Sequence, residues 1–206
     1  MQPENQVLLI SNYRQDKQFS MLKFGKLLIN EEYLYEDIHI EEIFPLPVFR
    51  KFMSTGGLSK WAAYIDKFLI FPKRVTHYLK KKSNFIGLVH IVDHSNAPYL
   101  NYIGKSSSAK RLLTCHDLIA IQTAFGDYPI APKTSITGIK LQSWIRNSFH
   151  FADYFTCDSH QTQKNLNQIF PHTKSISNVI HLGTEFNKLN SSSSSCDCSF
   201  DLPKTP

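Results

Sequence analysis

The sequence has few cysteines and no long apolar run. Its four cysteines, Cys115, Cys157, Cys196 and Cys198, form no C-x-x-C pair, and the amino end lacks the basic start and apolar centre of a cleavable secretion signal. A reduced, cytoplasmic protein is therefore expected. No stretch approaches the roughly 18 apolar residues that a membrane-spanning helix needs, so no such helix is predicted.

The motifs of several enzyme classes are also missing. The chain has no G-x-G-x-x-G fingerprint of a dinucleotide-binding dehydrogenase, no phosphate-binding loop and no G-x-S-x-G elbow of a serine hydrolase. It has no H-E-x-x-H and no paired Cys/His spacing. A metal centre is therefore not expected, although one set of side chains could converge in the fold: Asp93, His94, Cys115, His116 and Asp117.

Apolar residues are numerous enough to build a core. Of the 206 residues, 42% are hydrophobic, 13% aromatic and 19% charged, which excludes a disordered chain. The length is typical of one domain with a tail. The 23 basic and 17 acidic residues leave a formal net charge of +6, a mild preference for anionic partners such as phosphates, sugar nucleotides or an acidic membrane surface.

Short apolar runs alternate with helical patterns along the chain. Helices are expected between the runs, the longest over residues 59–82, where Pro72 is expected to kink or divide it. The order predicts an α/β fold with a mainly parallel sheet of six or seven strands, covered on both faces. The six runs that predict strands are residues 6–11, 37–43, 86–92, 111–115, 154–157 and 175–180.

Composition also suggests where the folded part ends. Residues 1–187 are assigned to one Rossmann-like domain. Residues 188–206, which include a run of five serines and two closing prolines, are expected to be a disordered tail.

Polar residues follow the predicted strands. In open parallel sheets the ligand crevice lies at the carboxyl ends of the strands, so these residues are the candidates for a site. His116 and Asp117 could form an imidazole–carboxylate pair, or His116 could be a loop histidine bonded to its neighbours. The set comprises Asn12, Tyr13, Asp93, His94, His116, Asp117, Ser159, His160, Gly183 and Thr184.

Several segments resemble the amino-terminal domain of glycosyltransferases of family 4. They are RLLTCHDLIAIQTAFGDYP (residues 111–129), ADYFTCDSHQTQKNL (152–166) and SNVIHLGTE (177–185), and LVHIVDHSNAPYL (88–100) and VLLISNYRQDKQFSM (7–21) fit the same family. Their order and spacing cover residues 6–187. The resemblance implies one half of a GT-B architecture, in which two Rossmann-like domains face each other across a cleft.

The resemblance also implies a reaction. Such enzymes transfer a sugar from a nucleotide-sugar donor with retention at the anomeric carbon, usually without a metal or other cofactor. The first domain mainly holds the acceptor, here a glycan or a lipid-linked molecule. His116 would reach across to the donor sugar, and Asp117 would orient that imidazole or bind a sugar hydroxyl. Substrate binding falls to Asn12, Tyr13, Asp93, His94, Ser159, His160, Gly183 and Thr184.

Two departures from the family's pattern shape the prediction. Residues 12–24 contain no glycine, whereas many members carry a glycine-rich turn after the first strand. The residues after Thr184 are too few for a donor-binding domain. The chain is therefore expected to be the acceptor-side domain of a truncated or split enzyme, inactive without a partner chain or the missing domain. The alternative is a non-catalytic module that binds a glycan or a lipid head group.

A basic run and a long predicted loop can each be interpreted either as ordinary surface structure or as part of a binding site. The basic run of Lys73, Arg74 and residues 80–82 is either a solvated helix end or a docking site for the anionic inner face of a membrane. Nucleic-acid binding is not expected, because aromatic interleaving is missing. Residues 119–138 are expected to form a long loop, either mobile or overhanging the acceptor cleft through Gln122, Phe125 and Tyr128.

Overall fold

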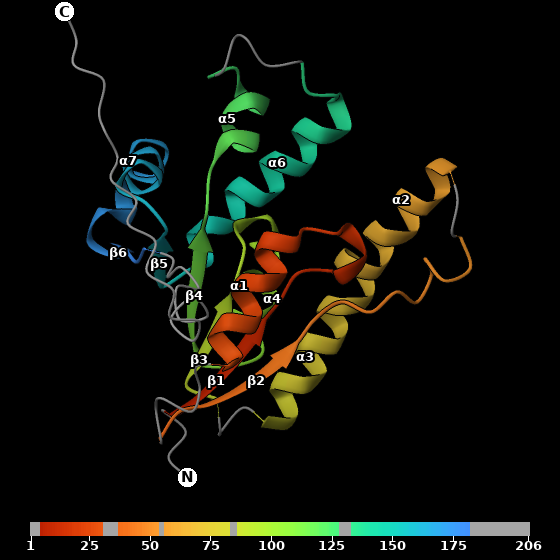
Figure 1. The fold of residues 1–206 in the computed structure, drawn as a ribbon, viewed down its shortest axis with the longest axis horizontal. Helices are drawn as coiled ribbons and strands as arrows, with labels where there is room; N and C mark the ends of the chain where they lie inside the picture. Colours follow the sequence, from red (N-terminus) through yellow and green to blue (C-terminus); the bar gives the residue numbers. More distant parts are fainter. Residues whose placement is uncertain (1–4, 31–36, 54–55, 83–85, 128–132, 182–206) are drawn as a thin grey trace, which may run out of the picture.

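One parallel sheet forms the centre of the protein (Figure 1). The structure, a computed structural model, describes residues 5–30, 37–53, 56–82, 86–127 and 133–181. The predicted α/β, Rossmann-like fold is confirmed, and the sheet has six strands, all parallel. They are β1 (Gln6–Ile10), β2 (His39–Ile43), β3 (Leu88–Ile91), β4 (Lys110–Cys115), β5 (Tyr154–Cys157) and β6 (Ser177–Val179).

In the described part of the chain, seven α-helices surround the sheet. They are α1 (Phe19–Asn30), α2 (Gly56–Ile65), α3 (Phe71–Lys82), α4 (Tyr99–Gly104), α5 (Ile119–Phe125), α6 (Ile136–Ser148) and α7 (His160–Ile169). Short helical turns add η2 (Arg14–Asp16), η5 (His94–Asn96), η6 (Phe149–Phe151) and η7 (Pro171–Ser175), and η4 (Asp66–Ile70) is a π-helical turn.

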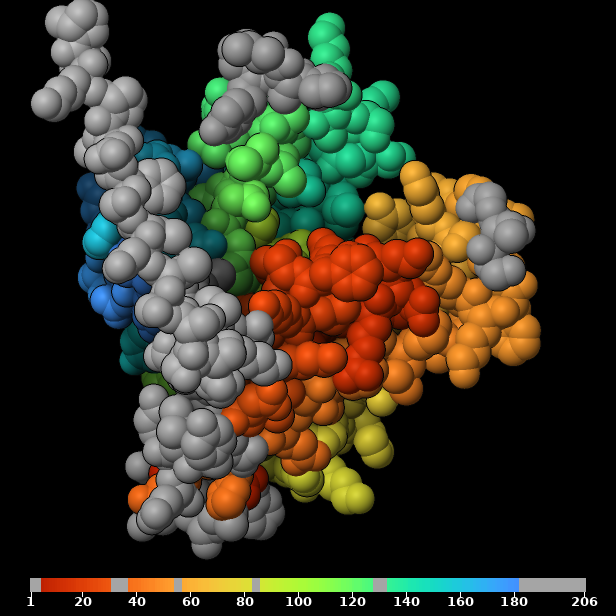
Figure 2. Space-filling model, viewed as in Figure 1, coloured from red at the N-terminus to blue at the C-terminus, as the bar shows by residue number. Residues whose placement is uncertain are grey.

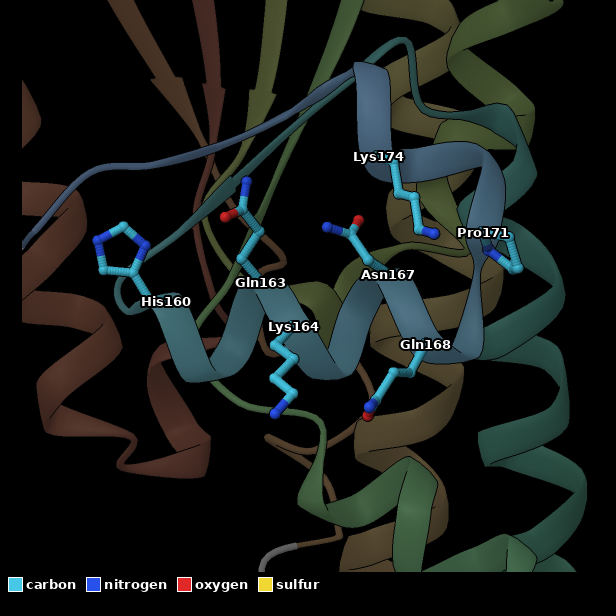
Figure 3. A pocket seen from close by; sticks show the side chains of 7 residues that line it. All are labelled: His160, Gln163, Lys164, Asn167, Gln168, Pro171 and Lys174. Carbon is cyan, nitrogen blue, oxygen red and sulfur yellow. The ribbon is translucent and has the colours of Figure 1, made fainter.

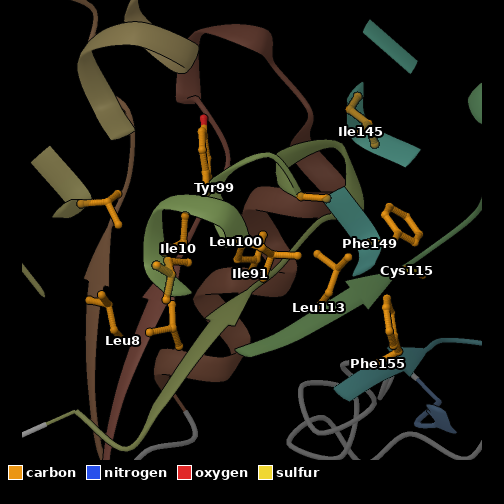
Figure 4. Close-up of a cluster of buried hydrophobic side chains, with 14 of the residues drawn as sticks. Leu8, Ile10, Ile91, Tyr99, Leu100, Leu113, Cys115, Ile145, Phe149 and Phe155 are labelled. Carbon is orange, nitrogen blue, oxygen red and sulfur yellow. The ribbon is translucent and has the colours of Figure 1, made fainter. Parts of the chain in front are cut away.

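The two faces of the sheet differ in chemistry because side chains alternate along each strand. One face carries Leu8, Ile10 and Ile91, which are buried in the main apolar cluster together with side chains of α3, α4 and η6 (Figure 4). On the other face, His90 of β3 meets Phe24 of α1, with the ring centroids 6.5 Å apart. The core thus lies mainly under α3 and α4, and α1 covers a more polar face.

The order of the strands in the sheet indicates which edge is suited to bind a ligand. The sheet runs β2-β1-β3-β4-β5-β6, so the chain leaves β1 to one side for β2 and returns on the other side for β3. Such a reversal is a topological switch point, and the crevice of an open α/β sheet lies outside the carboxyl ends of the two strands that flank it. Residues just after Ile10 and Ile91 are therefore the ones best placed to form a site.

The long helix predicted over residues 59–82 is present, but Pro72 does not divide it. The chain is helical from Gly56 to Lys82 through α2, η4 and α3. The irregularity is the π-helical turn Asp66–Ile70, which directly precedes Phe71 and Pro72. A proline ring clashes with the carbonyl four residues earlier, here that of Phe68, and the wider π turn relieves such a clash.

The loop predicted over residues 119–138 is wrong in its first part. Residues 119–125 form α5, whose buried Ile121 faces the core. Gly126 ends the helix with φ 90°, a left-handed conformation that favours glycine. Gln122 and Phe125 are thus helical residues, and Tyr128 lies outside the described residues.

The membrane, cysteine and tail predictions have the following outcomes. None of the described helices combines the length and the hydropathy needed to cross a bilayer. Cys115 and Cys157 are register neighbours on β4 and β5, and both are buried free thiols. Burial raises the pKa of the Cys157 thiol to about 12. The predicted tail at 188–206 lies outside the described residues, as do Gly183 and Thr184.

Candidate functional site

The carboxyl ends of β1 and β3 are joined by a buried amide–carboxylate network. The Asn12 side-chain amide donates to Asp93 Oδ2 at 2.7 Å and to Gln18 Oε1 at 2.7 Å, and its Oδ1 accepts from the Asn96 amide at 2.8 Å. Asn12, Asp93 and Asn96 are each at most 5% exposed. Asn12 and Asp93, which both follow predicted strands, are therefore in direct contact at the switch point of the sheet.

Asp93 carries a buried negative charge in this network. Its Oδ1 accepts from the Ser95 backbone amide at 3.1 Å, and its Oδ2 accepts from the Ser95 hydroxyl at 2.6 Å. His94 Nδ1 lies 3.2 Å from Oδ1, although its orientation does not make a hydrogen bond. Burial alone would raise the pKa of Asp93, but the nearby imidazole and the Ser95 donors outweigh it and hold the pKa well below its usual range.

Asn12 and Asp93 have little hydrogen-bonding capacity left for a ligand. Both amide hydrogens of Asn12 and its carbonyl oxygen are used, and each Asp93 oxygen already accepts within the protein. The sequence assigned both residues to substrate binding. We assign them instead to positioning, because they fix the two strand ends relative to each other.

Tyr13 has a similar internal role. Its side chain is only 1% exposed, and its hydroxyl donates to Asp66 Oδ2 at 3.1 Å. Burial, followed by this bond and the charge of Asp66, raises the Tyr13 pKa to about 12. Asp66 also accepts from the backbone amides of Phe49 at 2.8 Å and Arg50 at 3.2 Å. Tyr13 thus ties the end of β1 to the long helix rather than facing a substrate.

His116, at the end of β4, is held by backbone and by an aromatic ring. Its Nε2 donates to the Val92 carbonyl at 2.9 Å, next to Asp93, and its ring meets Phe24 edge-on at a centroid distance of 5.1 Å. The bond to a carbonyl fixes the proton of the neutral ring on Nε2. Nδ1 is buried and has no hydrogen-bond partner among the described residues.

Asp117 does not orient His116, which was one of the two roles predicted for it; binding of a sugar hydroxyl by Asp117 stays a prediction. Its Oδ1 accepts from the Ile119 backbone amide at 3.1 Å, and the residue is exposed. The reason is local: the Asp117 carboxylate turns back to the backbone two residues further along the chain, as aspartate side chains often do in turns. The carboxylate that faces His116 belongs to Asp158, whose Oδ2 is 3.5 Å from Nδ1.

The predicted set of site residues did not include Asp158 or Asn96. Asp158 directly follows β5 and precedes Ser159, so its position at a strand end was the available signal. Asn96 stands three residues after Asp93 in η5, which turns its amide back toward Asn12. Both were among or beside the polar residues that follow strands.

Ser159 and His160 begin α7. Ser159 is the helix N-cap: its Oγ accepts from the Thr162 backbone amide at 3.1 Å and lies 2.9 Å from the Thr162 hydroxyl. Its hydroxyl is therefore used in capping. His160 is exposed, and its ring centroid is 5.6 Å from that of His181.

A hollow of about 540 Å³ follows the outer side of α7 and η7. Figure 3 shows His160 at one end of it and Pro171 and Lys174 near the other. Of the predicted site residues that the structure describes, only His160 lines this hollow, so it is separate from the edge formed by β1, β3 and β4. Its other lining residues are Gln163, Lys164, Asn167 and Gln168.

Another histidine near His116 is His90, which lies on β3 and is buried. Its Nε2 is 2.7 Å from the Thr114 hydroxyl, which is 2.8 Å from the Thr156 hydroxyl. Burial, and to a lesser extent the neighbouring His116, lowers the His90 pKa to about 4. The imidazole is therefore neutral at physiological pH and serves as a polar link between strands.

The five side chains considered for a metal do not gather into one group. Within the described part of the chain, no cluster of three or more His, Cys, Asp or Glu side chains has the arrangement to hold a metal ion.

Comparison with known proteins gives no information about the family or function of this chain. Neither the protein-family models nor the curated proteins include a match to this chain.

Proposed function

We propose that this chain is the acceptor-side domain of a retaining glycosyltransferase of GT-B architecture. The reaction is transfer of a sugar from a nucleotide sugar to a glycan or a lipid-linked acceptor. One observation carries the proposal: two imidazoles, His94 and His116, stand at adjacent strand ends beside the switch point, and the buried Nδ1 of each makes no hydrogen bond among the described residues, although a carboxylate oxygen lies near each, Asp93 Oδ1 at 3.2 Å and Asp158 Oδ2 at 3.5 Å. Such atoms in a folded protein call for a polar partner.

The arrangement suits glycosyl transfer better than nucleophilic catalysis. An oxocarbenium-like transition state is stabilised by oriented polar groups, and a rigid site supplies them without reorganisation. Asn12, Asp93 and Asn96 provide the rigidity. His116 is the proposed catalytic residue, offering Nδ1 to a sugar hydroxyl once the Asp158 carboxylate, whose side chain is 23% exposed, rotates away.

The donor site belongs to a second Rossmann-like domain in this proposal. The described residues form one such domain, and a GT-B enzyme needs two. That second domain, in the same chain or in a partner chain, would hold the nucleotide sugar, which is a co-substrate. We propose no further cofactor. Peripheral contact with the anionic inner face of a membrane would suit a lipid-linked acceptor.

A glycan and glycolipid array tests the proposal. We expect the purified chain to bind one class of glycan or head group on the array, and His116→Ala to weaken that binding about 10-fold, equivalent to about 1.4 kcal/mol. His77→Ala is the matched control, because His77 is an exposed histidine of α3, a helix that contributes no residue to the candidate site. Affinity should be read from dilution series.

Two results would contradict parts of this proposal. Equal affinity of H116A and the unsubstituted chain would favour a non-catalytic glycan- or head-group-binding module. Turnover of a nucleotide sugar by the purified chain without any partner would contradict the assignment of the donor site to a second domain.

A further inference from the structure

Nine large apolar side chains are exposed within residues 46–69. Single exposed apolar residues are ordinary, but a concentration of this kind marks an interaction surface. We call residues 46–53 together with α2 and η4 the docking surface. Its exposed apolar side chains are Leu46, Val48, Phe49, Phe52, Met53, Leu58, Trp61, Tyr64 and Leu69, which range from 38% exposed at Tyr64 to 85% at Phe52.

The helical part of this surface is amphipathic. Ala62, Ala63 and Asp66 are buried against the protein, whereas Leu58, Trp61 and Leu69 are at least 60% exposed. The spacing of the exposed residues places them on one side of the helix. Their aromatic members contact each other: the Trp61 and Tyr64 ring centroids are 6.0 Å apart.

The loop and the helix of the docking surface are tied together. Asp66 accepts hydrogen bonds from the backbone of Phe49 and Arg50, so this part of the loop lies against η4. Figure 1 shows that the segment after β2 and the start of α2 extend beyond the carboxyl end of that strand. In Figure 2 the same segments form the orange bulge at the right-hand edge of the molecule.

Basic side chains far outnumber acidic ones in this region. Residues 44–82 contain nine basic side chains and a single acidic one, Asp66. Asp66 is fully buried, so it gives no negative charge to the surface. Arg50 and Lys67 have an ion-pair partner in Asp16, and Lys82 has one in Glu41. The nine are Arg50, Lys51, Lys60, Lys67, Lys73, Arg74, Lys80, Lys81 and Lys82.

We propose that the docking surface binds an anionic lipid bilayer, with Leu58, Trp61 and Leu69 entering the interface. Lysines and arginines around an apolar face that contains tryptophan and tyrosine fit lipid head groups above acyl chains. A second copy of the chain would bring basic side chains against basic ones, so self-association through this surface is disfavoured.

The surface also has a physical link to the candidate site. Asp66, which holds the loop, accepts from the hydroxyl of Tyr13, and Tyr13 follows Asn12 of the site network. A membrane against the docking surface would therefore lie beside the carboxyl edge of the sheet. From this we infer a lipid-linked acceptor, a choice that rests on the proposed function, whereas bilayer binding does not.

Vesicle binding by the full chain tests this inference. The probes are vesicles of phosphatidylcholine with or without an equal amount of phosphatidylglycerol. The chain has two tryptophans, so Trp144→Phe leaves Trp61 as the reporter. We expect W144F to float with the anionic vesicles and to shift its emission to the blue, with at least 10-fold weaker partition onto phosphatidylcholine alone.

Matched variants locate the contact. Leu58→Ser combined with Leu69→Ser should reduce partition onto the anionic vesicles at least 10-fold, whereas Ile136→Ser should leave it unchanged, because Ile136 is 75% exposed at the start of α6. Lys51→Glu with Lys60→Glu should reduce it similarly, and Lys140→Glu on α6 should not. Far-ultraviolet circular dichroism checks that each variant is folded.

Defined outcomes would overturn the inference. They are no flotation with anionic vesicles, flotation without a shift of the Trp61 emission, an equal loss in I136S, or a dimer that L58S/L69S dissociates. Glycan binding is measured without vesicles, so its failure alongside intact vesicle binding would remove the proposed function and the lipid-linked acceptor but leave the docking surface.

Discussion

Asp93→Ala is expected to lower the free energy of unfolding by about 3–5 kcal/mol, the range typical of removing one partner from a buried charged network. The substitution takes away the acceptor of the Asn12 amide and of both Ser95 donors, and these groups have little access to water because Asn12 is 1% exposed. Unpaired buried donors are the main cost. Equilibrium denaturation in urea measures the change.

The matched control is Asp117→Ala at the neighbouring strand end. Asp117 is exposed, and its side chain accepts a hydrogen bond from the backbone amide of Ile119, so its loss should cost about 1 kcal/mol or less. Asp93→Asn should be intermediate, since it keeps the shape but places an amide where Oδ1 or Oδ2 accepts. Similar losses for D93A and D117A would show that the network does not hold the two strands together.

Asp93 is also expected to make the protein less stable at acidic pH. Its pKa is depressed in the folded chain, so the folded state binds its proton more weakly than the unfolded state. This contribution to stability is present above the ordinary aspartate pKa of about 4 and is lost as the pH falls below it. The D93N variant should lack that part of the acid destabilisation, which acid titration followed by tryptophan emission can measure.

Much of the fold was predictable because buried parallel strands are continuous apolar runs. The strand Tyr154–Cys157 was predicted with the bounds it has, and β1 differs by one residue, Ser11. Helix α5 was missed because residues 119–138 were treated as one connection. The terminating Gly126 was the signal that its first third is a helix, since a left-handed residue ends many helices.

The location of the site could be predicted from the sequence, but the direction in which each side chain points could not. The rule that parallel strands end at one edge brought Asn12, Asp93 and His116 together, although 81 residues separate the first two. Which atoms remain available to a ligand depends on tertiary contacts that sequence spacing does not encode. Tyr13 points to Asp66 of the long helix, and the hydroxyl of Ser159 is used by Thr162.

A second pH dependence, at higher pH than that of Asp93, is expected from His90. Its pKa is lowered to about 4 in the folded chain against 6.5 for an ordinary histidine, so protonation favours the unfolded state. The sign follows: the stabilisation is complete above pH 6.5 and falls as the pH decreases toward 4. The difference of about 2.5 between the two pKa values corresponds to a loss of about 3–4 kcal/mol, at about 1.4 kcal/mol for each pH unit. Urea denaturation at several pH values between 7 and 4 measures it.

His90→Gln isolates this effect from the other histidines. Glutamine can still bond to the Thr114 hydroxyl, 2.7 Å from His90 Nε2, but it does not take up a proton. The H90Q chain should therefore lose some stability at pH 7 and yet show a flatter profile down to pH 4, so that the two curves converge. H77Q, at an exposed position on α3, should keep the unsubstituted profile. Parallel curves for H90Q and the unsubstituted chain would mean that His90 gains its proton without unfolding, with α1 and its Phe24 ring moving away from the sheet to admit water.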